Sequence, residues 1–504
     1  MAARPRSLSS ASSCILIDVI DIDDDPQDVF EDVVIDLTGD HLSHSLLRDG
    51  EVALDRLQAR GQTFSPGDVI EVHGAHLGSY SVDFLQVKVI AETRSREPIL
   101  RGLPLVRTTS LLGKLHMKKN EVCLLQFVER TADDNFPNRP IFLDIRPETN
   151  IEKRTLIITN APYPEHSFSS LKDRIGERTR RQGRAERSGL LACRWRLTVY
   201  FARKGRQMRP VEEALESLLA ADVPDVQYRV PDEALQNRWH GVYAKGGSWN
   251  GGRHAHVDLE AVPREPRTRG HGQKYTFFDA FSSAGGVSRG AQGAGFKVQY
   301  AVDNSPEVWD TYRMNFPNAT LYRTCIHGFL EQTTRNHVRV DCLHLSPPCQ
   351  YFSPAHTHDS VHDADNISAL FGCGELVKKT RPRIITLEQT FGITHNRHLP
   401  YFRALISQMT QYGYSDRKRL VVVAASPGHR LPPFPEATHS ETGGGGRKPF
   451  TTISQAISGI PRERGLHNVR GVRHFRPPRA PFNSHKLAGT VTTGFSAPPP
   501  VCGE

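Results

Sequence analysis

A cysteine that follows a predicted strand is the group in this 504-residue sequence best suited to nucleophilic chemistry. Cys349 lies in "HLSPPCQYFS", behind the apolar run "VDCLHLS" and two prolines. Since two prolines allow neither a continued strand ladder nor an immediate helix, we expect Cys349 on a stiff turn. Open α/β sheets keep their ligand sites at the carboxyl ends of strands. The alternative is a small buried structural cysteine, the commoner state of a free thiol.

A carboxylate and two arginines could complete a site with this thiol. Glu388 ends the apolar run "RIITLE", and Arg417 and Arg419 in "DRKRL" enter the next predicted strand. A thiolate can attack a carbon of an electron-poor ring while a carboxyl group protonates a ring nitrogen. The arginines would stabilise the charged intermediate or lower the pKa of the thiol.

Two further features predict a nucleotide-like cofactor. The small-residue turn in "DAFSSAGGVSRG" opens a helix, which brings backbone N–H groups close to a ligand. Asp303 ends the second predicted strand, where an acid accepts hydrogen bonds from ribose hydroxyls. Each signal alone is common in α/β proteins, but together they indicate a cofactor that contains adenosine.

The elements that position these residues alternate regularly from Tyr275 onwards. We expect strands at 275–281, 296–303, 319–326, 340–346, 383–389 and 419–426. Helices are predicted at 286–295, 306–316 and 399–413. Alternation of this kind predicts an α/β fold with a parallel, doubly wound sheet.

The preceding residues have a different character. Residues 1–58 are acidic and serine-rich, which predicts a disordered tail. Residues 59–170 hold short β-rich runs separated by turn residues, which favours a small all-β barrel or sandwich. Residues 171–273 combine the basic segment "KDRIGERTRRQGRAER", a strand-like run, a predicted helix "PVEEALESLLAA" and a linker. The basic segment is either a solvated helix or a nucleic-acid patch, and Arg178, Arg180, Arg181 and Arg184 would carry the latter.

Composition limits the possible partners. The net charge is +9, and residues 1–60 hold 13 acidic residues against 5 arginines, so the remainder carries +17. A strongly basic body indicates a polyanionic partner, with nucleic acid as the first candidate, although a merely soluble basic protein is the alternative. The 8 cysteines form no CxxC pair and no metal-ligand spacing, so we expect neither a metal nor structural disulfides. We find no signal peptide and no apolar run of membrane-spanning length, which predicts a soluble intracellular protein.

Taken in order, these motifs resemble the DNA cytosine-5 methyltransferases over roughly residues 274–495. "DAFSSAGGVSRG" is similar to their first cofactor motif, "SPPCQ" to their nucleophile motif, "LEQT" to their Glu-Asn-Val motif and "RKRLVVVA" to their Arg-x-Arg motif. "PPCQYFSPAHT" and the Glu-Gln-Thr variant look most like the fungal RID/Masc group. That group carries a module of the bromo-adjacent homology (BAH) type, which "GLPLVRTTSLLGKLHMKKNEVCLLQ" resembles.

The resemblance implies a mechanism and a set of site residues. Cys349 would add to C6 of a cytosine flipped out of DNA, and Glu388 would hydrogen-bond or protonate N3. S-adenosylmethionine would then supply the methyl group for C5. The catalytic domain would span 274–428, followed by a partial target-recognition region at 429–504. The cofactor residues implied are Phe281, Ser283, Ala284, Gly285, Asp303, Asn304, Pro348 and Leu370.

The same resemblance implies a nuclear protein engaged in DNA methylation and repeat silencing, with chromatin bound through the BAH-like module. The run "VVIDLTGD" looks like a SUMO-interacting motif, in which Val33, Val34, Ile35 and Leu37 would face SUMO. A featureless acidic tail is the alternative. For the whole chain, the second hypothesis is a catalytically degenerate, DNA-binding or chromatin-binding relative of the methyltransferases.

Four departures from the family favour that second hypothesis. Ser283 stands where the family has glycine, and Cys325 where an Asp contacts adenine. After "QYGYS" the family has a further strand and loop, but "DRKRL" follows here at once, so we expect no hairpin partner and unsatisfied backbone groups. The family's last motifs, including an Asn that closes the cofactor pocket, do not follow "GTVTTGF". We therefore expect very weak cofactor binding and no measurable turnover by this 504-residue chain.

Overall fold

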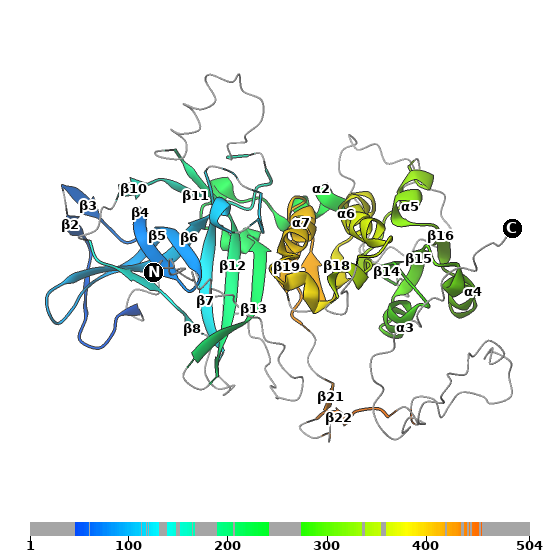
Figure 1. The fold of residues 1–504 in the computed structure, drawn as a ribbon. Helices are drawn as coiled ribbons and strands as arrows, with labels where there is room; N and C mark the ends of the chain where they lie inside the picture. The colour runs from blue at the N-terminus through cyan, green and yellow to red at the C-terminus, as the bar shows by residue number, and fades with distance from the viewer. Residues whose placement is uncertain are drawn as a thin grey trace, which may run out of the picture. The chain divides into compact units, whose positions relative to one another are not determined.

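A computed structural model of the chain (Figure 1) describes most residues between Leu46 and Gln455. The described residues are 46–59, 61–111, 113–116, 118, 120–147 without 131–138, 152–163, 165–166, 189–204, 207–240, 274–334, 338–353, 359–418, 421–434, 438–440, 443, 446–452 and 455. The SUMO-interacting motif expected at 33–37 and the basic segment 172–187 lie outside them.

Strands dominate the described chain as far as Ser217. Their bounds are β1 Val52–Leu54, β2 Leu57–Ala59, β3 Gln62–Phe64, β4 Val69–Leu77, β5 Tyr80–Glu92, β6 Pro98–Arg107, β7 Glu121–Arg130, β8 Arg139–Pro140, β9 Leu143–Ile145, β10 Glu152–Arg154, β11 Leu156–Ile158, β12 Leu191–Lys204 and β13 Gln207–Ser217. Antiparallel pairing joins β4, β5, β6 and β7 in turn, and β12 adds to β7 in parallel. We call residues 46–217 the β module. Its cores are apolar, with Phe84, Leu103 and Leu124 among the buried side chains.

The helix predicted for residues 210–221 is wrong, because β13 covers most of that segment. The run is rich in Glu, Ala and Leu, which favour helices. In the fold it pairs antiparallel with β12 along its whole length. Tertiary pairing of this kind commonly overrides a weak local preference.

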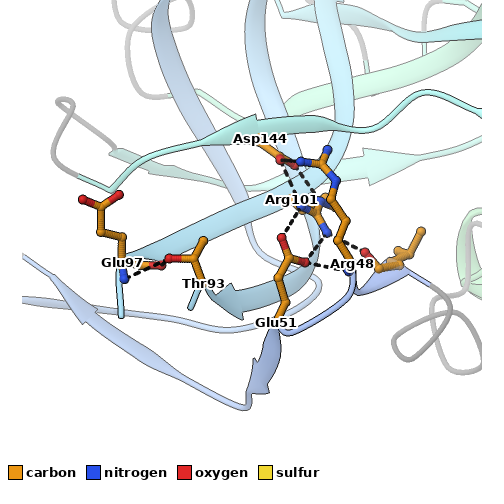
Figure 2. Close-up of polar contacts among 7 residues, drawn as sticks. Arg48, Glu51, Thr93, Glu97, Arg101 and Asp144 are labelled. Atoms are coloured by element: carbon orange, nitrogen blue, oxygen red, sulfur yellow. Dashed lines mark hydrogen bonds and ion pairs between the residues drawn. The ribbon is translucent and has the colours of Figure 1, made fainter. Parts of the chain in front are cut away.

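A buried arginine fastens the residues before β1 to the β module (Figure 2). Arg101 on β6 is only 2% exposed. Its Nη1 and Nη2 donate to Glu51 at 2.7 and 3.0 Å, and its Nε and Nη2 donate to Asp144 at 2.6 and 3.0 Å. Nη1 also donates to the Leu46 carbonyl at 2.6 Å. Two carboxylates therefore compensate one buried guanidinium from both sides.

From Thr276 the chain alternates between strands and helices, which confirms the predicted α/β pattern. Its elements are β14 Thr276–Ala280, α3 Gly286–Gly293, β15 Lys297–Asp303, α4 Pro306–Asn315, β16 Thr320–Arg323, α5 Ile326–Gln332, β17 Cys342–Leu345, α6 Asp363–Thr380, β18 Ile384–Glu388, α7 Leu399–Thr410, β19 Ser415–Lys418 and β20 Val421–Ala425. The strands lie in the order β16-β15-β14-β17-β18-β20-β19. The first five are parallel, and β20 is antiparallel to β18.

Helices cover both faces of this sheet (Figure 1). Phe278 and Ala280 of β14 belong to a core shared with α5, α6 and α7, whereas Phe277 packs with α3 on the other face. The sequence analysis missed α5 and α6. The sequence of α6, "DADNISALFGCGELVKKT", mixes polar and apolar residues, so its apolar face is hard to recognise from sequence. In the structure that face is buried and includes Leu370, Cys373 and Val377.

The expectation that the last strand would lack a hairpin partner is also wrong. β19 is short, but it pairs antiparallel with β20 on one side. On its other side it pairs with β13 of the β module, in the register Ala214 to Arg417. The hydroxyl of Ser415 reinforces this contact by accepting the Ser217 N–H at 2.8 Å. A strand from an earlier part of the chain therefore pairs with backbone groups of β19 on the side away from β20.

Helix α2 (Asp232–His240) follows the β module and packs against the α/β part of the chain. Trp239 packs edge-on against Tyr414, and its Nε1 donates to the Tyr414 hydroxyl at 2.8 Å. The described residues from Phe434 onwards belong to a second unit, which includes the two-residue pairing of β21 (His439–Ser440) with β22 (Lys448–Pro449). None of the described helices is long and apolar enough to span a membrane.

Candidate functional site

The turn after β14 is the first wall of the candidate site. Phe281 and Ser283 adopt left-handed backbone angles, with φ of 65° and 47°, and Gly285 follows with φ of 92°. The Phe281 and Ser282 N–H groups both donate to the Val302 carbonyl, at 2.9 and 3.1 Å, which holds the turn against β15. Ser283 and Ala284 are exposed. Left-handed angles are unfavourable for residues with a Cβ, so Ser283 occupies a strained position.

Asp303 links this turn to the end of β15. Its Oδ2 accepts the Ser283 N–H at 2.7 Å, and its Oδ1 accepts the Ser305 N–H at 2.8 Å. Each carboxylate oxygen can accept more than one hydrogen bond, so both remain able to bind hydroxyl groups. The side chain is partly exposed and Asn304 beside it is exposed. This turn and acid fit the ribose end of an adenosine-containing cofactor.

A buried carboxyl group supports the turn from below, and sequence reasoning missed it. Asp279 on β14 is 1% exposed, and its Oδ2 accepts both the N–H and the hydroxyl of Ser288 on α3, at 3.0 and 2.6 Å. The Ser288 and Tyr312 hydroxyls lie 2.7 Å apart. Burial raises the pKa of Asp279 to about 7, against the effect of the Ser288 hydrogen bonds. An acid inside the apolar run "YTFFDAF" was the signal that could have identified it.

The loop after β17 carries the predicted nucleophile. Ser346 donates its N–H to the Ala280 carbonyl at 3.4 Å and its hydroxyl to the Phe281 carbonyl at 3.3 Å, which ties the loop to the cofactor turn. Pro347 is buried, Pro348 and Cys349 are half-buried, and a 3-10 turn begins at Gln350. The structure therefore places Cys349 just past the carboxyl end of β17, as predicted.

Glu388 lies at the carboxyl end of the neighbouring strand β18 and is exposed. Burial raises the pKa of the Cys349 thiol above its ordinary value, and the nearby negative charge of Glu388 raises it further. The two predicted catalytic groups therefore interact across adjacent strand ends. A thiol whose pKa is raised by burial and by Glu388 is protonated at neutral pH, so its proton must be lost, for example to water, before the sulfur can bond to a substrate.

Gln389 is a second residue that sequence reasoning missed. Its side chain is buried beside Glu388, and its Nε2 donates to the Pro347 carbonyl at 3.2 Å. Its Oε1 accepts the Thr390 N–H at 2.8 Å. The residue thus connects the end of β18 to the loop that carries Cys349.

The remaining predicted residues are placed as follows. Arg417 lies on β19, where the structure describes its backbone pairing but not its side chain, and Arg419 lies outside the described residues. Cys325 is exposed and begins α5, where its sulfur accepts the Gly328 N–H at 3.4 Å. Leu370 lies on α6 and is fully buried in the core. No cluster of metal-ligating side chains occurs in the part of the chain that the structure describes.

Comparison with known proteins supports the reading of this sheet. Residues 275–426 match the family model of the C-5 cytosine-specific DNA methylases. The matched segment runs from β14 to the residue after β20, and so contains the turn, Cys349 and Glu388. The segment is therefore similar in sequence to the C-5 cytosine-specific DNA methylases.

Three curated relatives each match only part of this chain. The chain is 28% identical to type II methyltransferase M1.HphI of Haemophilus parahaemolyticus, over 40% of this chain and 56% of the relative. It is 27% identical to type II methyltransferase M.XorII of Xanthomonas oryzae pv. oryzae, over 36% and 46%. It is also 27% identical to DNA (cytosine-5)-methyltransferase 1 of Mus musculus, over 35% and 13%. The chain spans about half the length of the two bacterial relatives.

Proposed function

We propose that this chain is a DNA (cytosine-5-)-methyltransferase that uses S-adenosylmethionine. The observation that carries the proposal is the placement of Cys349 just past the end of β17 and of Glu388 at the end of the adjacent strand β18. The cofactor turn adjoins the same edge through the Ser346 contacts with Ala280 and Phe281. Nucleophile, carboxyl group and cofactor turn thus occupy one edge of one sheet, which is where open α/β sheets bind ligands.

In the proposed mechanism the substrate is a cytosine flipped out of double-stranded DNA, since Cys349 cannot reach a base inside the helix. The Cys349 sulfur bonds to C6 as Glu388, in its protonated form, gives a proton to N3, so the ring electrons reach C5 as an enamine. Bound S-adenosylmethionine supplies the methyl group that C5 takes. Return of the N3 proton to Glu388, loss of the C5 proton to a base such as water, and departure of the Cys349 thiolate from C6 would then restore the ring. Arg417 and Arg419 would stabilise the charge on the ring.

The cofactor would bind across the turn and the end of β15. Asp303 would accept the ribose hydroxyls, with Asn304 beside it, and Phe281 would contact the base. Ser283, Ala284 and Gly285 would border the rest of the molecule, Pro348 would close the side nearest Cys349, and Leu370 would act only by packing behind the pocket. The fit rests on the exposed turn and on an acid whose oxygens both retain acceptor capacity.

The proposals for DNA, chromatin and SUMO as partners rest on the sequence alone. The basic composition outside the acidic tail supports binding to DNA phosphates. The resemblance to the fungal RID/Masc group supports a nuclear protein that silences repeats, with the β module as a BAH-like contact to chromatin and Val33–Leu37 as a contact to SUMO.

A covalent trap tests the proposed function. DNA that carries 5-fluorocytosine cannot lose a proton from C5, so after methyl transfer the sulfur stays bonded to C6. The full chain with S-adenosylmethionine should form this adduct, Cys349→Ser should not, and Cys373→Ser should behave as the wild type because Cys373 is buried in the α6 core. DNA binding without any adduct would instead support a degenerate, DNA-binding relative of the family. An adduct formed by Cys349→Ser would remove Cys349 from the nucleophile role.

A further inference from the structure

The contact between Gln389 and the Pro347 carbonyl joins the two strand ends that carry Cys349 and Glu388. It is made by a side chain that is only 4% exposed. Gln389 follows Glu388 directly, while Pro347 precedes Cys349 by two residues. A shift at this single contact would therefore move the thiol and the carboxylate relative to each other.

The local chemistry explains why this contact is needed. Pro347 and Pro348 have no N–H, so the loop cannot be held by ladder hydrogen bonds from these residues to β18. The Pro347 residue is buried, and a buried carbonyl without a donor costs about 1–3 kcal/mol. On the opposite side, Ser346 already binds the loop to the end of β14. Gln389 supplies the matching attachment to β18.

The length of the side chain also matters. The Gln389 amide uses both ends, with its Nε2 on Pro347 and its Oε1 on the Thr390 N–H. An asparagine at this position would be one methylene shorter and could not keep both hydrogen bonds from the same backbone. A glutamate would keep the length, but it would replace the donor by an oxygen facing the Pro347 carbonyl.

We propose that Gln389 is a positioning residue that holds the Cys349 loop against the end of β18 and thereby fixes the separation of the Cys349 thiol from the Glu388 carboxylate. Its importance for methyl transfer rests on the proposed function, but its effect on the thiol does not. Released from β18, the thiol would lie farther from Glu388 and closer to water. Both changes favour the thiolate.

The test measures alkylation of Cys349 by iodoacetamide in the full chain, without DNA or cofactor, from about pH 7 to about pH 10.5, a range that spans the ordinary pKa of a thiol. Mass spectrometry of the peptide that carries Cys349 separates it from the other seven of the 8 cysteines. The variants are Gln389→Met, Gln389→Asn and Glu388→Gln. The matched control is Gln408→Met, which removes a comparable bond from a glutamine amide to a backbone group, the Gly374 N–H at 2.9 Å.

We expect the midpoint of the alkylation profile to move down by at least about 0.5 pH unit in both Gln389 variants, a shift readily resolved in thiol titrations. Glu388→Gln as a single substitution should also lower the midpoint of the Cys349 alkylation profile. Added to Gln389→Met, it should lower the midpoint little further. Gln408→Met should leave the midpoint unchanged. If Gln389→Met does not yield folded protein, Gln389→Asn decides alone.

An unchanged midpoint in a folded Gln389 variant, or an equal shift in Gln408→Met, would overturn the proposal. A full Glu388→Gln effect in the Gln389→Met background would do the same. A separate methyl-transfer assay shows whether the displaced thiol lowers kcat more than it changes KM. Loss of activity in every chain, wild type included, would count against the proposed function while leaving the alkylation result intact.

Discussion

Replacing Ser283 by glycine should stabilise this protein, although it removes a side chain. Ser283 holds a left-handed backbone angle, with φ of 47°, in the turn that borders the candidate cofactor site. Its side chain is exposed, and the hydrogen bond to Asp303 comes from its backbone N–H, which glycine retains. The substitution therefore removes the backbone strain and keeps the contact that shapes the turn.

The expected gain is small but measurable. The left-handed region costs a residue with a Cβ about 1–2 kcal/mol. Glycine adds freedom to the unfolded chain, which offsets about 0.4–1 kcal/mol of this gain. The net increase in the free energy of unfolding should be about 0.5–1 kcal/mol. In a domain of this size it should raise the Tm by roughly 1–4 °C.

Differential scanning calorimetry and a titration with S-adenosylmethionine would measure the two consequences. Ser283→Ala is the matched control, because it removes the hydroxyl and keeps the Cβ and the strain. We expect Ser283→Ala to change the free energy of unfolding by less than about 0.5 kcal/mol, as an ordinary surface substitution does, and so to leave the Tm nearly unchanged. Ser283→Gly should also raise the affinity for the cofactor, since it clears a side chain from the exposed face of the turn.

Equal Tm values for Ser283→Gly and Ser283→Ala would refute the reasoning, because they would show that the turn stores no strain at this residue. A higher Tm with lower cofactor affinity would refute only the second half, and would mean that the Ser283 side chain contacts the cofactor favourably.

Three further predictions concern the buried acid, the β module and the basic segment. The folded pKa of Asp279, about 7, exceeds its unfolded value of 3.8, so the Asp279 contribution should make stability fall as pH rises from about 4 to about 7. Asp279→Asn should lose that part of the pH dependence and should be more stable than the wild type at pH 8. Urea unfolding of both proteins at pH 5 and pH 8 measures this difference. Arg101→Met should cost about 3–5 kcal/mol, because it leaves the carboxylates of Glu51 and Asp144 without their buried cation, and a chemical-denaturation midpoint close to that of the wild type would contradict this. DNA affinity should fall steeply as the salt concentration rises. A variant that neutralises four arginines of the basic segment should show a shallower slope of log K against log salt concentration in fluorescence anisotropy. An unchanged slope would indicate a solvated segment that does not touch DNA. The four arginines are Arg178, Arg180, Arg181 and Arg184.

Much of the candidate site could be predicted from sequence, because its motifs are local. The run that ends in two prolines fixed Cys349 at a strand end, and the alternation of strands and helices placed Glu388 at the next one. Carboxyl ends of parallel strands meet at one edge, so order along the chain was enough to bring the two residues together. The resemblance to a family with glycine at position 283 is consistent with the left-handed angle that Ser283 adopts.

Only the tertiary structure decided the features that depend on residues far apart in the chain. Local propensity indicated a helix for residues 210–221, but β12 and β19 offer that segment hydrogen-bond partners on both sides, and it becomes β13. The same pairing completes β19, the hairpin partner of β20 that the sequence analysis did not expect. Asp279 and Gln389 each hydrogen-bond to a residue outside their own strand. Asp279 accepts the Ser288 hydroxyl of α3, and Gln389 donates to the Pro347 carbonyl of a neighbouring loop. No periodicity or spacing encodes such a contact, because it exists only after the sheet has brought its strand ends together.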